Sequence, residues 1–384
     1  MSERQQAEAG RVRLASALSA SGALTSEWVE AYQAVPRDWF VPDLIWPGRA
    51  DGVRQEESAH RLADPARWWE AVYSDIPLTT QWDDGEHTGN GRGTTPTSSN
   101  SMPTMVFSML AALNPQDGHR VLEIGTGTGW NAALLSHQVG DGNVVTVEVD
   151  QESAAAAKYR LAQAKCAPRI VVGDGAKGCP DGAPFDRVIA TCSVRRVPYE
   201  WVAQARPGAV IVVPWAPEYG GEAVVRLTVG EDGTASGRFV GSSAFMRLRR
   251  QRAERPNSLA YLSGPWPADG VRSTTTLSPE DVGGWLAMFA VGARVPDAFP
   301  LVERYADGSY TLWLHDTAVT SWSTVDWEPG RTSYEVVQSG PRSLWDEVAA
   351  AHYWWRDQGH PGFERFGLTV TPEGETVWLD SPAT

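Results

Sequence analysis

Three glycines at every second position, Gly125, Gly127 and Gly129, follow the apolar run V-L-E-I at residues 121–124. A strand that turns sharply into a helix needs residues without a Cβ, because the backbone adopts unusual dihedrals and approaches a ligand closely. Dinucleotide-binding turns read G-x-G-x-x-G, whereas here Trp130 stands where the last glycine would be. The spacing weakens an NAD interpretation and favours a different nucleoside.

Two acidic residues flank this turn. Glu123 stands just before the glycines, and Glu148 closes the strand-like run at residues 144–149. A carboxylate about 20 residues beyond a glycine turn is well placed to accept hydrogen bonds from ribose hydroxyls. The combination favours S-adenosylmethionine. The alternative is a glycine-rich turn that binds no ligand.

The elements that must position these residues are those of an α/β fold. Short Val/Ile-rich runs alternate with helical segments, which is typical of a parallel sheet with helices on both faces. Ligands of such sheets lie at the carboxyl ends of the strands, so we expect residues there to meet in one crevice: Gly125, Glu148, Asp174 and Thr191. Asp174 is also explained by an ordinary turn. The expected strands are 121–124, 144–149, 169–175, 185–191 and 209–215, with helices at 132–139 and 152–164.

The residues before the turn predict helices at 5–20 and 26–35. Two prolines make V-P-R-D-W-F-V-P, residues 35–42, a rigid connector that packs on the core. Residues 83–100 form a long loop rich in glycine and hydroxyl side chains, and Pro103 opens a helix that Ser101 is placed to cap.

Composition excludes several classes. A chain of 384 residues is long enough for two domains, and its net charge of −14 disfavours nucleic acid and anionic membranes as partners. Cys166, Cys179 and Cys192 form no C-x-x-C pair, so neither a disulfide framework nor a metal site is expected. No apolar run approaches the ~18 residues of a membrane helix, which suggests a cytoplasmic protein.

Several of these motifs occur together and in order in a known family. V-P-R-D-W-F-V-P, S-x-S-M-P at residues 99–103, L-E-I-G-T-G-T-G, the acidic strand end at Glu148, G-D-G-A-K-G at 173–178 and F-D-R-V-I-A-T make residues 10–215 resemble protein-L-isoaspartate O-methyltransferase. The resemblance implies a Rossmann-like methyltransferase domain that uses S-adenosylmethionine. Here Ser99 replaces the family's usual threonine, the glycine-rich loop is longer, and the region after residue 240 has no expected counterpart in the repair enzymes.

The resemblance also implies residue roles. Glu123, Gly125, Thr126 and Gly127 would surround the methionine part of the cofactor, and Glu148 would bind the ribose. Val149 would cover one face of the adenine, and Asp174 with Gly175 would meet its edge. Ser101 would be the active-site serine, near the carboxylate that accepts the methyl group.

The implied reaction requires alignment more than proton transfer. A carboxylate with a pKa of about 4 is already ionised at pH 7, so it needs no strong general base. The hydroxyls of Ser99 and Ser101 can hold it by hydrogen bonds without a stable salt bridge, which would favour the ground state and raise no rate.

The sequence changes character after residue 240. The run S-A-F-M-R-L-R-R-Q-R contains Arg247, Arg249 and Arg250, and it is interpreted either as a solvated charged face or as a docking strip for an acidic peptide. Half of the 18 tryptophans follow, most of them expected in a core and some in a peptide groove. We expect a catalytic domain at 1–240 and an α+β accessory domain for substrate recognition at 241–384.

The substrate is implied by resemblance alone. The runs T-C-S-V-R-R-V-P and T-A-S-G-R-F are most similar to methyltransferases associated with ATP-grasp peptide maturation (graspetide) systems. These are thought to methylate an aspartate of a cross-linked ribosomal peptide, leading through a succinimide to isoaspartate. The alternatives are isoaspartate repair, a non-catalytic peptide-binding partner, and a nucleic-acid methyltransferase, which the charge disfavours. The sequence does not indicate an oligomeric state.

Overall fold

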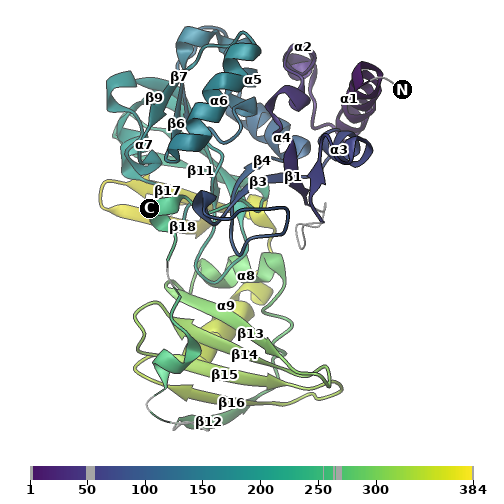
Figure 1. Ribbon diagram of the computed structural model, residues 1–384. Coiled ribbons are helices and arrows are strands. Elements are labelled where there is room, and N and C mark those ends of the chain that lie inside the picture. The colour runs from purple at the N-terminus through teal and green to yellow at the C-terminus, as the bar shows by residue number, and fades with distance from the viewer. Residues whose placement is uncertain (1–2, 49–56, 254, 263, 265–269, 383–384) are drawn as a thin grey trace.

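The computed structural model describes residues 3–48, 57–253, 255–262, 264 and 270–382. In this part of the chain the strands form three sheets (Figure 1). We call them the small sheet, the large sheet and the C-terminal sheet. Their strand orders are β2-β1-β3-β4, then β18-β17-β11-β10-β9-β8-β5-β6-β7, then β12-β16-β15-β14-β13.

The large sheet contains the glycine turn. Strands β5 (Val121–Ile124), β6 (Val144–Glu148), β7 (Arg169–Val172), β8 (Phe185–Ala190) and β9 (Ala205–Trp215) pair in parallel, as predicted. Except in the edge strand β7, their apolar runs are buried between helices α4 (Pro103–Leu113), α5 (Trp130–Val139), α6 (Gln151–Gln163) and α7 (Tyr199–Ala203). The predicted helices and strands of this region are confirmed to within a few residues.

The large sheet continues as antiparallel strands. Strands β10 (Ala223–Val229) and β11 (Ala235–Ser242) follow β9, and the last hairpin of the chain, β17 (Phe366–Thr371) with β18 (Gly374–Leu379), pairs with β11. Hairpin β17–β18 therefore belongs to the large sheet, although the expected boundary near residue 240 assigned it to the accessory domain. The chain leaves the large sheet after β11 and returns to it at β17.

The residues between these strands build the C-terminal sheet. It contains β12 (Val271–Thr275), β13 (Ala298–Arg304), β14 (Tyr310–Asp316), β15 (Trp322–Trp327) and β16 (Tyr334–Ser339). Helices α8 (Trp285–Gly292) and α9 (Leu344–Asp357) lie between this sheet and the rest of the molecule (Figure 1). Phe289 of α8 packs against Trp215, Phe239 and Phe366 of the large sheet, so an aromatic contact joins α8 to the large sheet.

The small sheet corrects the expectation of a long loop. Strands β1 (Leu44–Pro47) and β2 (Ala59–His60) pair with each other, and β3 (Leu78–Trp82) pairs with both β1 and β4 (Pro96–Asn100). Residues 96–100 are therefore a strand, and only 83–95 connect β3 to β4. The polar sequence P-T-S-S-N lacks the apolar alternation from which strands are usually predicted.

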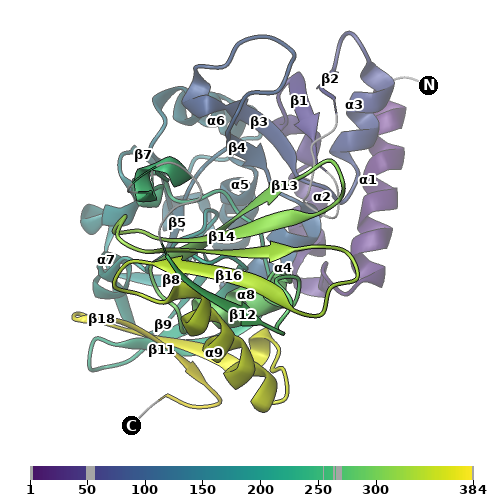
Figure 2. The same ribbon diagram turned by 90° about the horizontal axis from the view of Figure 1, so that it is seen from below.

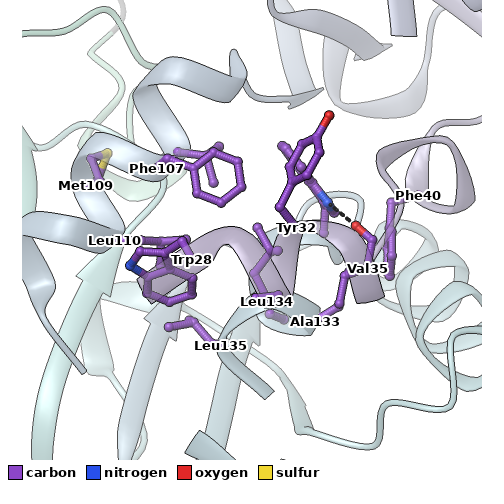
Figure 3. Packing of buried hydrophobic residues seen from close by; sticks show 14 of the residues in the cluster. Trp28, Tyr32, Val35, Phe40, Phe107, Met109, Leu110, Ala133, Leu134 and Leu135 are labelled. Atoms are coloured by element: carbon purple, nitrogen blue, oxygen red, sulfur yellow. Dashed lines mark hydrogen bonds between the residues drawn. The ribbon is translucent and has the colours of Figure 1, made fainter. Parts of the chain in front are cut away.

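The N-terminal helices cover one side of the large sheet. Helices α1 (Glu3–Ala20), α2 (Val29–Ala34) and α3 (Pro65–Val72) lie on the opposite side of the molecule from hairpin β17–β18 (Figure 2). Tyr32 and Trp28 pack edge-on against Phe107 of α4, which in turn packs against Trp130 at the start of α5 (Figure 3). This aromatic cluster fixes the N-terminal segment against the helix that follows the glycine turn.

Candidate active site

The glycine turn joins β5 to α5 at the carboxyl edge of the large sheet. Gly125, Gly127 and Gly129 all have positive φ angles, of 94°, 52° and 93°. A Cβ on Gly125 would lie 2.7 Å from Oγ1 of Thr191, whose hydroxyl donates to the Gly125 carbonyl. Both the dihedrals and the close approach therefore require glycine, and Thr191 meets the turn as predicted.

Glu123 lies beneath this turn and not on its ligand-facing side. Its side chain is completely buried, and its carboxylate accepts hydrogen bonds from Asn131 (2.7 Å) and from the Thr146 hydroxyl. The Thr146 hydroxyl also lies 2.6 Å from that of Thr126. Burial raises the pKa of Glu123 to about 7, more than these hydrogen bonds lower it. Glu123 and Thr126 thus support the turn from below.

Glu148 has the position expected of a ribose-binding carboxylate. One oxygen accepts from the backbone N–H of Gly127 at 2.9 Å and the other from that of Asp150 at 3.0 Å. These bonds fix the carboxylate at the end of β6, and each oxygen retains a lone pair for a hydroxyl donor. The geometry fits a vicinal diol.

A cavity of about 250 Å³ adjoins this carboxylate, and it is lined by Val149, Asp174, Gly175, Leu248, Arg249 and Arg250. Val149 is 43% exposed, which is unusual for a valine at a strand end. A Cβ on Gly175 would lie 2.7 Å from Ile124, so glycine is needed for this close packing. The cavity offers apolar faces and one acidic edge, as an adenine requires.

Asp174 has two partners already. Its Oδ1 accepts from the Ala176 N–H at 3.0 Å, as in an ordinary turn, and its Oδ2 lies 3.0 Å from Arg250. The turn interpretation is therefore correct, and the location beside the cavity is correct as well.

The arginines after residue 246 are paired within the chain. Arg249 lies 2.9 Å from Asp84 and 3.6 Å from Asp150, while Arg252 lies 2.8 Å from Asp84. Arg247 donates to the carbonyl of Ala216 at 3.1 Å. Their charge is thus largely neutralised by acids of the cofactor side, and the docking of an acidic peptide on Arg247, Arg249 and Arg250 stays a prediction.

Strand β4 brings the predicted acceptor serines to the glycine turn. A Cβ on Gly127 would lie 3.5 Å from the Ser99 carbonyl oxygen and 3.9 Å from the Ser98 hydroxyl. Ser99 and Ser101 are half-buried, and their hydroxyls donate to no other side chain or carbonyl of the described residues. Both are therefore available to a ligand.

The expected cap on α4 is wrong. Pro103 does open the helix, but its N-cap residue is Met102, without a side-chain hydrogen bond. Asp75 provides the cap from another segment, with Oδ1 accepting from the Thr104 N–H at 2.8 Å and Oδ2 from the Thr104 hydroxyl at 2.6 Å. Because Asp75 takes this role, the Ser101 hydroxyl has no structural function in the helix.

Arg37 is a site residue that the sequence interpretation missed. Its guanidinium is 1% exposed and makes six hydrogen bonds with described residues: Asn100 Oδ1 (2.6 Å) and the carbonyls of Val72, Ser74, Ile76, Asn100 and Ser101. The Asn100 amide then donates to the Thr128 hydroxyl in the glycine turn at 2.9 Å. Arg37 and Asn100 thus join the acceptor strand to the turn, and the signal was a charged pair, Arg37 and Asp38, inside a proline-bounded segment that packs on the core.

The assembled site combines a nucleoside cradle with a carboxylate-sized acceptor position. Glu148 and the cavity at Val149 and Asp174 fit an adenosine, and the glycine turn leaves space for the remainder of S-adenosylmethionine. No group of three or more metal-ligating side chains occurs within the described ranges. No helix in those ranges is long and apolar enough to cross a membrane.

Comparison with known proteins agrees with this geometry. The sequence profile of the family described as "Protein-L-isoaspartate(D-aspartate) O-methyltransferase (PCMT)" matches residues 62–253, half of the chain. A protein-L-isoaspartate O-methyltransferase of Methanopyrus kandleri is 35% identical over 62% of this chain and 90% of its own length. The enzyme of the same name from Ignicoccus hospitalis is 33% identical over 54% of this chain and 82% of its own length.

One solved structure extends the likeness beyond the sequence matches. A structure named protein-L-isoaspartate O-methyltransferase aligns over 97% of this chain and all of its own, with a TM-score of 0.54 and 20% identity. This match concerns the fold alone. It reaches residues after 240, where no counterpart in the repair enzymes was expected.

Proposed function

The chain belongs to the protein-L-isoaspartate(D-aspartate) O-methyltransferase family, and on this premise we propose that it methylates the free carboxylate of an isoaspartyl residue in a peptide chain. The family uses S-adenosylmethionine, and the chain is a carboxyl O-methyltransferase that depends on this cofactor. The substrate is the proposed part. The names of the relatives support isoaspartate over an aspartate of a dedicated peptide.

The observation that carries the proposal is the contact between β4 and the glycine turn. Ser99 passes within 3.5 Å of the point where a Gly127 side chain would begin, and Ser101 follows two residues later. The backbone that carries both serines is therefore adjacent to the cofactor cradle. The bound cofactor supplies an electrophilic methyl group.

The chain's own residues perform orientation. A substrate carboxylate is ionised at neutral pH. The site therefore needs hydrogen-bond donors that hold one carboxylate oxygen in line with the methyl group and leave a lone pair of that oxygen available for the attack. The hydroxyls of Ser99 and Ser101 are such donors. Arg37 lies behind them with its guanidinium already saturated by six acceptors, so it positions the strand without pairing with the substrate.

The product is a methyl ester, and its further reaction needs no second enzyme. The nitrogen of the next backbone amide attacks the ester carbonyl, a C–N bond forms, and methanol leaves with the amide proton. The resulting succinimide is hydrolysed by water to aspartyl or isoaspartyl chains. Repeated methylation of the isoaspartyl product would convert the population to aspartate.

The test is methylation of matched peptides. The protein is incubated with S-adenosylmethionine and with isoaspartyl, linear aspartyl or side-chain cross-linked peptides of one sequence, and mass spectrometry follows the gain of about 14 Da. We expect the isoaspartyl peptide to be methylated and the linear aspartyl peptide to remain unchanged. Methylation confined to the cross-linked peptide would overturn the proposal.

That last result would favour a second candidate, aspartate methylation in a cross-linked ribosomal peptide. The supporting observation is connectivity: the segment that lines the cofactor cavity, Leu248–Arg250, precedes Tyr261, whose ring contacts His315 of the C-terminal sheet. A substrate recognised by that sheet would reach the site along this segment. Both candidates share the chemistry at Ser99 and Ser101, and the three peptides distinguish them.

A further inference from the structure

A second cavity, of about 280 Å³, lies between the small sheet and helix α6. Trp46, Trp82 and His87 form an aromatic wall, and one face of α6, from Glu152 to Arg160, also lines the cavity. Gly127, Thr128 and Ser98 line it as well. The cavity therefore borders both the glycine turn and the acceptor strand, and it extends from them to Arg160 of α6.

One basic side chain that lines this cavity contacts no carboxylate of the described residues. Arg160 of α6 is half-buried, and within the described residues its guanidinium makes no hydrogen bond and no ion pair. Burial lowers the pKa of Arg160. The negative charge of Asp43 raises this pKa, although Asp43 does not lie within ion-pair distance of the guanidinium. By contrast, Arg249, Arg250 and Arg252 each contact a carboxylate.

An unpaired, partly desolvated guanidinium costs free energy that an anionic ligand recovers. Carboxylates match its planar donor fork and bind it in two-point geometry. Among the described residues the only lining acid is Glu152, which is exposed and lies two helical turns from Arg160, roughly 12 Å along the axis. The Arg160 end of the cavity is therefore the basic end.

The aromatic wall is held by the connection between β3 and β4. Trp46 packs edge-on against Trp82 at 6.0 Å, and its indole N–H donates to the Asn90 carbonyl at 3.2 Å. The sequence predicts that this connection is longer than in the repair enzymes. Gly85 and His87 of the same connection line the cavity.

We propose that this cavity is a substrate subsite, in which Arg160 binds a carboxylate of the peptide close to the residue that is methylated. The proposal rests on the proposed function, because the peptide must place its reacting carboxylate at Ser99 and Ser101. Trp46 and Trp82 contact the aliphatic part of the bound residue. The carboxylate belongs either to an acidic side chain or to the peptide's C-terminus.

Peptide binding in the presence of S-adenosylhomocysteine tests the subsite apart from turnover. Hexapeptides with a central isoaspartate carry glutamate or glutamine at each neighbouring position, with a free or an amidated C-terminus. We expect one glutamate position, or the free C-terminus, to lower Kd about tenfold, since a partly buried charge pair has this strength. The amidated peptides identify which carboxylate is bound.

The variant Arg160→Gln should remove that preference and leave the affinity for the glutamine peptide unchanged. Lys158→Gln is the matched control, because Lys158 is an exposed cation on the same helix and its loss changes the net charge equally. Equal affinity for glutamate and glutamine peptides in the wild type, or a preference that survives Arg160→Gln, would overturn the subsite.

A loss of S-adenosylhomocysteine affinity in Arg160→Gln would also overturn it, because the cavity would then hold part of the cofactor. Thermal unfolding of both variants checks that the fold is retained. Methylation of the same peptides tests the proposed function separately: turnover without any charge preference refutes the subsite alone, whereas a charge-dependent affinity without turnover refutes the proposed function alone.

Discussion

Arg37 and His315 are both buried, ionisable side chains, but they differ in their hydrogen bonding. Both are 1% exposed. Arg37 makes six hydrogen bonds, whereas neither ring nitrogen of His315 has a hydrogen-bond partner among the described residues. His315 instead stacks within an aromatic cluster of the C-terminal sheet, on Trp313 at 5.7 Å and near Tyr261 at 4.3 Å.

The difference shows what each region requires. A saturated guanidinium fixes the relative position of several backbone segments, because each acceptor must lie at a defined direction from the planar fork. An imidazole without partners contributes packing only, and burial keeps it neutral, with a pKa of about 4. Arg37 therefore holds its region by directional bonds, whereas His315 contributes to the C-terminal sheet by apolar contact.

The largest expected effect is at Arg37. Arg37→Lys replaces the fork by a point charge with fewer donors and leaves buried carbonyls without partners, so we expect the free energy of unfolding to fall by about 3–5 kcal/mol. Urea unfolding measures this change. Arg272→Lys, at an exposed arginine paired with Glu335, is the control and should change stability little. Equal effects of the two variants would remove the distinction drawn for Arg37.

The next effect concerns His315 and pH. Its folded pKa lies below its ordinary value of 6.5 because burial disfavours the charged form. The unfolded chain therefore binds a proton that the folded chain excludes, and stability is fully present above pH 6.5 and decreases as the pH falls toward 4. A shift of this size corresponds to roughly 3 kcal/mol at most.

Urea unfolding of His315→Phe at pH 7.5 and pH 4.5 isolates this contribution. We expect the variant to lose less stability than the wild type between the two values. A substitution at the exposed His137 should leave the pH dependence of the wild type unchanged. If His315→Phe retained the full acid sensitivity, the imidazole would not be the excluded base.

Ser101→Ala tests the catalytic side of the comparison. Its hydroxyl caps no helix, so we expect no loss of stability but a fall in kcat of about 10–100-fold, as when one donor to a reacting oxygen is removed. Cofactor affinity, measured by calorimetry with S-adenosylhomocysteine, should not change. A wild-type rate in Ser101→Ala would exclude this role, and Ser108→Ala, at an exposed serine of α4, is the control.

The smallest expected effect is at the ion pairs across the cofactor side. Asp84→Asn removes the partner of Arg249 and Arg252, both of which are partly exposed, so we expect a loss of stability below about 1 kcal/mol. The dissociation rate of S-adenosylhomocysteine should rise a few-fold, since Asp84 links residues 83–85 to the segment that lines the adenine cavity. Stopped-flow fluorescence measures that rate, and high salt should mimic the substitution.

Several features followed from local sequence. The glycine turn, Glu148 and the parallel strands between residues 121 and 215 were predictable because strand and helix periodicities repeat over a few residues, and because a positive φ selects glycine. The strand at 96–100 was missed because its hydroxyl-rich sequence shows no alternation. It is a strand because β3 and the glycine turn lie on either side of it.

Contacts between residues far apart in the chain were decided by the tertiary structure alone. Arg37 meets Asn100 across 63 residues, and Arg252 meets Asp84 across 168. Hairpin β17–β18 returns to the large sheet after the whole C-terminal sheet has intervened. No local pattern encodes such pairs. The sequence around a charged residue does not show whether its side chain forms hydrogen bonds with water or with a distant backbone carbonyl. The sequence thus determined the cradle for the methyl donor, and long-range hydrogen bonding decided how the acceptor strand is held against it.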